Sequence, residues 1–313
     1  MPHPFRFGVG LGEGPDPAGL AQHARSVEAL GYDVLLVADH LVGQLAPVPV
    51  LTAAALATSR LRLGTLVLNN DLRHPVVLAQ ELATVDQLSA GRLEIGMGAG
   101  WDRLDYKRSG IRFRPHRERA ARLAEAVDVL VQLFGEQPCT FDGRYYQVDQ
   151  LDGWPKPVQR PHPPLLIGGG GRRLLELAAR SAQMVGLAPR IGPVADIRSC
   201  LAPATEEKLG WVRAAAGGRF PSLVISSYTA LGPVTITDHA RREARHLADR
   251  LEAQYGVALT EDELLDSPHA LIGSVGELVE KCRALRERFG ISYLTIFGDP
   301  RPFAPVVQRL TGT

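Results

Sequence analysis

Short apolar segments alternate with longer amphipathic segments along the whole chain of 313 residues. The short segments are rich in Val, Ile and Leu, are bounded by Gly, Pro or Asn, and are apolar at nearly every position. Such continuous apolar runs are typical of parallel strands that are covered on both faces. They predict eight strands, at Phe5–Leu11, Asp33–Val37, Leu61–Leu68, Arg92–Met97, Pro164–Ile167, Met184–Leu187, Leu223–Thr229 and Tyr293–Phe297.

The segments between these strands have the periodicity of amphipathic helices. Residues Pro75–Leu88 show it most clearly, because Pro stands in the first turn, apolar side chains recur every three or four positions, and Gly91 follows the end. Further helices are predicted at Pro17–Leu30, Arg117–Phe134, Arg172–Ala182, Asp196–Ala215, Asp238–Tyr255, Val275–Phe289 and Pro302–Leu310. Eight strands alternating with helices predict an α/β fold, a (β/α)8 barrel rather than an open doubly wound sheet, in a single domain over residues 1–313.

Two connections are longer than a plain strand-to-helix loop requires. Residues 136–163 precede the fifth strand, and residues 230–290 lie between the seventh and eighth strands and are predicted to hold two helices. We interpret both segments as insertions into the barrel. Insertions of this kind usually carry substrate pockets or oligomer contacts.

Charge and cysteine content exclude several classes of protein. The chain has 35 Lys and Arg against 34 Asp and Glu, a formal charge of +1, whereas nucleic-acid binding requires a basic surface. Cys139, Cys200 and Cys282 are odd in number and far apart, which favours a reducing compartment over disulfides or a zinc site. The N-terminal residues do not resemble a signal peptide, and no apolar stretch approaches ~18 residues. We therefore expect a cytoplasmic protein with neither a nucleic-acid nor a membrane partner.

Candidate chemical groups follow four of the predicted strands, where a barrel places its active site. They are Asp39-His40 after the second strand, Asn69-Asn70-Asp71 after the third, Gly98-Ala99-Gly100-Trp101 after the fourth, and Gly168–Arg173 after the fifth. A histidine exchanges a proton near neutral pH, and an adjacent aspartate can orient a ligand. Asp39 and His40 are therefore candidates for acid/base chemistry, with a capped surface turn as the alternative.

The four consecutive glycines Gly168, Gly169, Gly170 and Gly171 leave backbone N–H groups accessible at the start of a helix. Such an arrangement predicts a cradle for a phosphate, with a simple tight turn as the alternative. Two other glycine-rich segments fail the G-x-G-x-x-G pattern, because Glu13 and Trp101 occupy the position of the third glycine. A Rossmann dinucleotide site is therefore not supported. No Cys or His residues show metal-ligand spacing, so no metal is predicted.

Four segments carry longer motifs. They are LLVADH at 35–40, LRLGTLVLNNDLRHPVVLAQELATVDQLSAGRLEIGMGAGW at 61–101, PVQRPHPPLLIGGGGRRLLELAAR at 157–180 and IGSVGELVEKCRALRERFGISYLTIF at 272–297. With these motifs, the chain resembles the bacterial luciferase-like flavin and deazaflavin oxidoreductases over nearly its full length. The resemblance is greatest to the branch that depends on coenzyme F420.

The resemblance implies a (β/α)8 barrel with the deazaflavin or isoalloxazine ring in a pocket at its rim. By position it assigns His40 as the active-site histidine, Asp39 beside the ring, a cis peptide at Leu66-Val67 behind it, Asn69 in contact with the cofactor tail or ring edge, Ala99 and Gly100 flanking the ring, and Gly168–Gly171 at the phosphate. Trp101 stands where the sugar-phosphate dehydrogenases of this group have Glu, so glucose 6-phosphate is not the expected substrate. Trp101 is assigned to the substrate pocket, with packing against Tyr145-Tyr146 as the alternative.

The expected function is an F420-dependent oxidoreductase that transfers a hydride between C5 of the deazaflavin and a small organic substrate, with His40 assisting proton transfer. Two alternatives stay open. One is an FMN-dependent monooxygenase that uses O2 and reduced flavin from a separate reductase, and the other is a non-catalytic flavin-binding protein. The resemblance also implies a homodimer.

Overall fold

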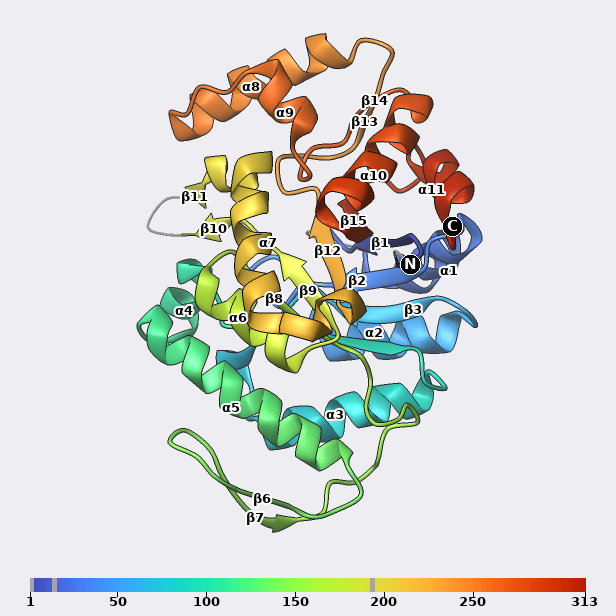
Figure 1. The fold of residues 1–313 in the computed structure, drawn as a ribbon. Coiled ribbons are helices and arrows are strands. Elements are labelled where there is room, and N and C mark those ends of the chain that lie inside the picture. Colours follow the sequence, from blue (N-terminus) through green and yellow to red (C-terminus); the bar gives the residue numbers. More distant parts are fainter. Residues whose placement is uncertain (1–2, 13–15, 192–194) are drawn as a thin grey trace. The chain divides into compact units, whose positions relative to one another are not determined.

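The computed structural model describes residues 3–12, 16–191 and 195–313. Its main sheet contains β1 (Arg6–Gly10), β2 (Val34–Val37), β3 (Arg62–Thr65), β4 (Leu68–Asn69), β5 (Leu93–Gly98), β8 (Leu165–Gly169), β9 (Met184–Leu187), β12 (Val224–Tyr228) and β15 (Ile291–Phe297). The strand order is β3-β2-β1-β15-β12-β9-β8-β5-β4, and β3 also pairs with β5, which closes the sheet (Figure 1). The fold is the predicted (β/α)8 barrel.

The strands were predicted well because they are buried on both faces. All six residues of β5 are buried, for example, and parallel pairing joins β5 to β3 and to β8. The segment Leu61–Leu68, predicted as one strand, is divided into two strands, β3 and β4. The Leu66–Val67 peptide bond between these two strands is cis, as the resemblance implies.

The helices are α1 (Leu20–Ala29), α2 (Pro47–Ala57), α3 (Pro75–Leu88), α4 (Arg103–Ser109), α5 (His116–Phe134), α6 (Arg172–Ser181), α7 (Ala202–Ala216), α8 (Ala240–Tyr255), α9 (Glu261–Asp266), α10 (Val275–Phe289) and α11 (Ala304–Leu310). The prediction of one helix over Asp196–Ala215 was wrong at its start. A 3-10 turn at Ile197–Cys200 comes first, and α7 begins afterwards with Pro203 in its first turn. Proline fits the first turn of a helix but cannot continue a preceding one.

By contact density the chain forms two compact units, one of residues 1–10, 29–34 and 168–313 and the other of residues 11–28 and 35–167. In the second unit, the insertion at 136–163 contains the antiparallel hairpin of β6 (Cys139–Asp142) and β7 (Gln147–Leu151), which lies along α5 (Figure 1). The Glu125 carboxylate on α5 accepts hydrogen bonds from three successive N–H groups of the hairpin turn. A single domain over residues 1–313 stays a prediction.

In the first unit, the insertion at 230–290 contains α8, α9 and α10 and the parallel pair β13 (Thr235–Ile236) and β14 (Ile272–Gly273). The short helix α9 is additional to the two helices predicted there. Part of this insertion packs with Ile197 and Cys200 in a small hydrophobic cluster, which also includes Leu231, Leu247, Leu251, Leu264 and Ile272. Among the described residues, no helix combines the length and the apolar character that a bilayer span requires.

Candidate active site

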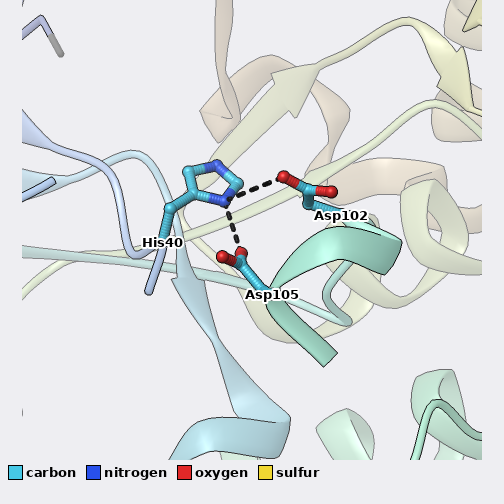
Figure 2. Close-up of side chains that lie close together, drawn as sticks. All are labelled: His40, Asp102 and Asp105. Atoms are coloured by element: carbon cyan, nitrogen blue, oxygen red, sulfur yellow. Dashed lines mark hydrogen bonds and ion pairs between the residues drawn. The ribbon is translucent and has the colours of Figure 1, made fainter. Parts of the chain in front are cut away.

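His40 lies directly after β2, and a buried carboxylate holds its imidazole in place. Nδ1 of His40 is 2.7 Å from Oδ2 of Asp105 and 4.0 Å from Oδ2 of Asp102 (Figure 2). The side chain of Asp105 is 1% exposed, that of His40 19% and that of Asp102 30%. The histidine is therefore anchored on one side and still accessible to a small molecule.

Both aspartates come from the first turn of α4, which follows β5. Asp102 is the N-cap residue, and its Oδ1 accepts a hydrogen bond from the N–H of Leu104 at 2.8 Å. Asp105 stands three positions later, a spacing that places two side chains on the same face of a helix. The sequence contained this spacing, but nothing in it showed that the carboxylates meet a histidine 65 residues away.

Trp101 packs against His40. The two ring centroids are 5.4 Å apart and the ring planes are almost perpendicular, at 82°. The alternative contact with Tyr145-Tyr146 is not what the structure shows, because the ring of Tyr146 contacts His74 instead, at 5.3 Å. Trp101 is 50% exposed, so an indole face beside the histidine is accessible to solvent.

Asp39, the neighbour of His40 in the sequence, has a separate set of contacts. Its buried carboxylate accepts hydrogen bonds from Nη1 of Arg73 at 2.6 Å and from the backbone N–H of Asn69 at 3.0 Å. Asp39 and His40 therefore have separate partners, whereas their adjacency had suggested a single acid/base pair. Arg73, which balances the charge of Asp39, was not identified from the sequence.

Asn69 contributes to the internal structure of the site. Its Oδ1 accepts hydrogen bonds from the backbone N–H of Asp71 and from the Tyr106 hydroxyl, both at 3.1 Å. Burial raises the pKa of Tyr106 to about 12, so this hydroxyl keeps its proton at neutral pH. The remaining hydrogen-bonding capacity of the Asn69 side chain lies in its amide nitrogen, which is the group that could meet a ligand.

Ala99 and Gly100 are held by neighbours within the same unit. The carbonyl oxygen of Ala99 accepts a hydrogen bond from Nε of Arg119 at 3.1 Å. Gly100 has a φ of +75°, and a Cβ there would overlap the Tyr106 hydroxyl and Oδ1 of Asn69. Residue 100 must therefore be glycine for internal reasons, whether or not a ligand is bound.

The four glycines at 168–171, in the other unit, are only partly a turn. Gly168 and Gly169 end β8, two residues beyond the predicted end of this strand at Ile167, so the turn itself consists of Gly170 and Gly171. A Cβ on Gly170 would overlap the carbonyl oxygen of Pro189, whereas a Cβ on Gly171 would meet nothing. Gly171 is the N-cap residue of α6 and provides no side chain to the N–H groups of the first turn. Those N–H groups could bind an anion.

Within the part of the chain that the structure describes, one group of three side chains could supply metal ligands. It consists of His40, Asp102 and Asp105, whose candidate ligand atoms all lie within 4.8 Å of one another. The short contact between His40 and Asp105 has the geometry of a hydrogen bond, which accounts for their proximity without an ion. The prediction that no metal binds stays a prediction.

The fold and these residues define a (β/α)8-barrel protein with polar groups at the carboxyl ends of β2, β4 and β5. A family model described as luciferase-like monooxygenase matches residues 1–253. The chain belongs to the luciferase-like monooxygenase family, which is a family of enzymes by its description.

Similar proteins include both F420-dependent enzymes and monooxygenases. The F420-dependent glucose-6-phosphate dehydrogenase of Nakamurella multipartita is 35% identical over 190 residues, which cover 58% of this chain and 55% of that protein. The matched region thus spans about half the length of this curated relative.

Two solved structures show the same fold. The coenzyme F420-dependent tetrahydromethanopterin reductase of Methanopyrus kandleri has a TM-score of 0.79 at 20% identity over 99% of both chains. A monooxygenase from Streptomyces bottropensis has a TM-score of 0.73 at 24% identity over 97% of both chains.

Proposed function

We propose that this protein is an F420-dependent oxidoreductase that moves a hydride between the deazaflavin and a small organic substrate. The observation that carries the proposal is an accessible imidazole after β2, anchored through Nδ1 to the buried carboxylate of Asp105. Figure 2 shows its second ring nitrogen directed away from both carboxylates, where it can exchange a proton with a substrate. The similarity to relatives named as F420-dependent supports the choice of cofactor.

The first turn of α6 fits the anionic part of a cofactor. The first turn of α6 begins at a glycine without a capping side chain, and its N–H groups and helix dipole favour a phosphate group. In the other unit, the proposed ring contacts are those that the resemblance implies: Asp39, His40, Leu66, Val67, Asn69, Ala99 and Gly100. When bound, F420 supplies the hydride donor or acceptor at C5.

His40 handles the proton that accompanies the hydride. In the direction of alcohol oxidation, the substrate C–H bond breaks with its electron pair, and the hydroxyl proton passes to Nε2 of His40. In the reverse direction, Nε2 returns that proton to the carbonyl oxygen. The half-exposed indole of Trp101 lies against His40 and provides an apolar contact for the substrate.

A second candidate is an FMN-dependent monooxygenase, which the description of the matching family favours. In that reaction reduced FMN would come from a separate reductase, and His40 would assist the oxygen chemistry. A homodimer is part of both proposals.

Cofactor binding and turnover separate these proposals. Purified protein is titrated with F420 and with FMN, and fluorescence quenching gives the two affinities. F420 reduction is then followed with a panel of small alcohols for the parent protein and for His40→Ala. We expect His40→Ala to bind F420 and lose turnover by roughly 10²–10⁴-fold, because general acid–base catalysis contributes about that much.

The exposed His246 on α8 provides a matched control, since His246→Ala removes an imidazole far along the chain from the proposed site. Tight binding of FMN without binding of F420 would favour the monooxygenase. Binding of either cofactor with no turnover of any kind would favour a non-catalytic flavin-binding protein. Unchanged turnover in His40→Ala would remove this histidine from the mechanism.

A further inference from the structure

We propose that Asp105 is the positioning residue that fixes the tautomer of His40, with the ring proton on Nδ1 and the lone pair on Nε2. Nothing in the sequence singled out this aspartate. The tautomer follows from the geometry and from the acceptor chemistry of a carboxylate, and only its use as a proton acceptor rests on the proposed function.

The two carboxylate oxygens of Asp105 have different partners. Oδ1 accepts a hydrogen bond from the backbone N–H of Leu41 at 2.9 Å, and Oδ2 lies 2.7 Å from Nδ1 of His40. An ionised carboxylate can only accept hydrogen bonds, so the imidazole must be the donor in the second contact. A neutral imidazole that donates from Nδ1 carries its lone pair on Nε2.

Burial of the Asp105 carboxylate keeps water from replacing His40 as its partner. The carboxylate is 1% exposed, so water does not compete for Oδ2. The same side chain binds the backbone N–H of Leu41 and the ring of the preceding residue, so it orients the histidine both through the main chain and directly. Moreover, a buried carboxylate compensates the positive charge that the ring acquires when it takes a second proton.

Asp102 does not share this role, although it lies close by. Its Oδ2 is 4.0 Å from Nδ1, beyond hydrogen-bond distance, and its Oδ1 caps α4 through the N–H of Leu104. Asparagine is also a good N-cap residue, so Asp102→Asn preserves the helix start. This substitution therefore removes a nearby negative charge without removing the acceptor at Nδ1, and it is the matched control.

Asp105→Asn is expected to invert the tautomer. The N–H of Leu41 requires an oxygen as its partner, which directs the amide oxygen of the new asparagine to Leu41 and its NH2 group to His40. Nδ1 must then accept a hydrogen bond, and the ring proton moves to Nε2. A ring with its proton on Nε2 cannot take the hydroxyl proton of a substrate.

Histidine labelled with 15N reports the tautomer directly. Multiple-bond proton–nitrogen correlation spectra, recorded where the rings are neutral, show which nitrogen of each of the nine histidines is protonated, and His40→Ala identifies the signal of His40. We expect protonated Nδ1 in the parent protein and in Asp102→Asn, and protonated Nε2 in Asp105→Asn. A parent protein with protonated Nε2, or an Asp105→Asn variant with an unchanged tautomer, would overturn the proposal. Should Asp105→Asn fail to fold by circular dichroism, the parent spectrum still decides.

Kinetics form the second part of the test. Asp105→Asn should lower kcat with F420 and an accepted alcohol by roughly 10²–10⁴-fold, as expected for a general base held in the wrong tautomer. Its affinity for F420 should change less than about threefold, because the lost interaction matters to the chemical step. Weakened F420 binding with unchanged kcat would instead show a purely structural role. If the parent binds neither cofactor, the proposed function fails while the tautomer result stands.

Discussion

Lys208 should make the stability of this protein depend on pH in a defined way. Its side chain on α7 is fully buried, and its Nζ donates hydrogen bonds to the carbonyl oxygens of Ala188 and Ser199, both at 2.7 Å. Burial lowers the pKa of Lys208 to about 8. The unfolded chain has an ordinary lysine pKa of about 10.4, so between about pH 8 and pH 10.4 the unfolded state binds more protons than the folded state. In that window, the contribution of Lys208 to the free energy of unfolding rises with pH.

The magnitude follows from the size of the shift. A difference of about 2.4 pKa units means that the charged Lys208 lowers the free energy of unfolding by about 3 kcal/mol, at 1.36 kcal/mol per unit. This is an upper value, because the two hydrogen bonds favour the charged amine and so reduce the shift. Lys208→Met removes the charge but leaves two buried carbonyl oxygens without this donor, at about 1–3 kcal/mol each. Around pH 7, the gain in stability from removing the buried charge and the loss from the two missing hydrogen bonds nearly cancel in the free energy of unfolding. Above about pH 10 the variant should be less stable than the parent by roughly 2–6 kcal/mol, because only the loss of hydrogen bonds remains.

Reversible urea denaturation of both proteins, followed by circular dichroism from about pH 7 to about pH 10.5, measures this effect. The informative quantity is the difference between parent and variant. Burial raises the pKa of Cys200 to about 12, which makes stability fall with pH in the same range. Because Lys208 opposes that rise, parent and variant are both compared with Cys200 replaced by Ala. Lys107→Met, which removes an exposed lysine of α4, is the control and should give a difference that is flat with pH. A flat difference for Lys208→Met as well would refute the reasoning.

Three further predictions concern single contacts. Gly170→Ala should lower the free energy of unfolding by about 1–3 kcal/mol because its Cβ would overlap the Pro189 carbonyl, whereas Gly171→Ala should change it by less than about 0.5 kcal/mol; thermal denaturation compares the two. Arg73→Met leaves the buried Asp39 carboxylate without its counter-charge and should lower the free energy of unfolding by about 3–5 kcal/mol. In a double-mutant cycle, adding Asp39→Asn to Arg73→Met should recover part of that loss. All three cysteines are buried, so Ellman's reagent should react with none of them in the native protein and with three in denaturant; rapid labelling of the native protein would contradict the burial.

The barrel could be predicted because its strands repeat one simple pattern. A parallel strand covered on both faces is apolar at almost every position, so eight such segments were recognisable without any knowledge of their partners. Helix α2 escaped the same analysis for a related reason. Its sequence PVPVLTAAALA is apolar around most of its circumference, so it lacks the polar face that marks an amphipathic helix. The helices α4 and α9, of 7 and 6 residues, were missed as well, because each lies in a connection where a longer helix gives the clearer pattern. Helix α11, also of 7 residues, was predicted because it follows the last strand directly.

The candidate site was predictable in position and not in its contacts. The rule that barrel active sites follow the carboxyl ends of strands was enough to select His40 and Trp101. Their partners could not be selected, because a hydrogen bond between residues 65 positions apart leaves no periodic trace in the sequence. Asp102 and Asp105 look like an ordinary helix start, where acidic residues are common.

The separation of Asp39 from His40 shows why adjacency misleads at the end of a strand. Successive side chains of an extended chain point in opposite directions, so two neighbours meet different surroundings. Asp39 turns to the guanidinium of Arg73, and His40 turns to the carboxylate of Asp105. Each side chain therefore has its own partner from a later part of the chain. The orientation of the His40 ring is consequently set by a contact with α4, a helix that sequence analysis did not detect, rather than by the aspartate beside it.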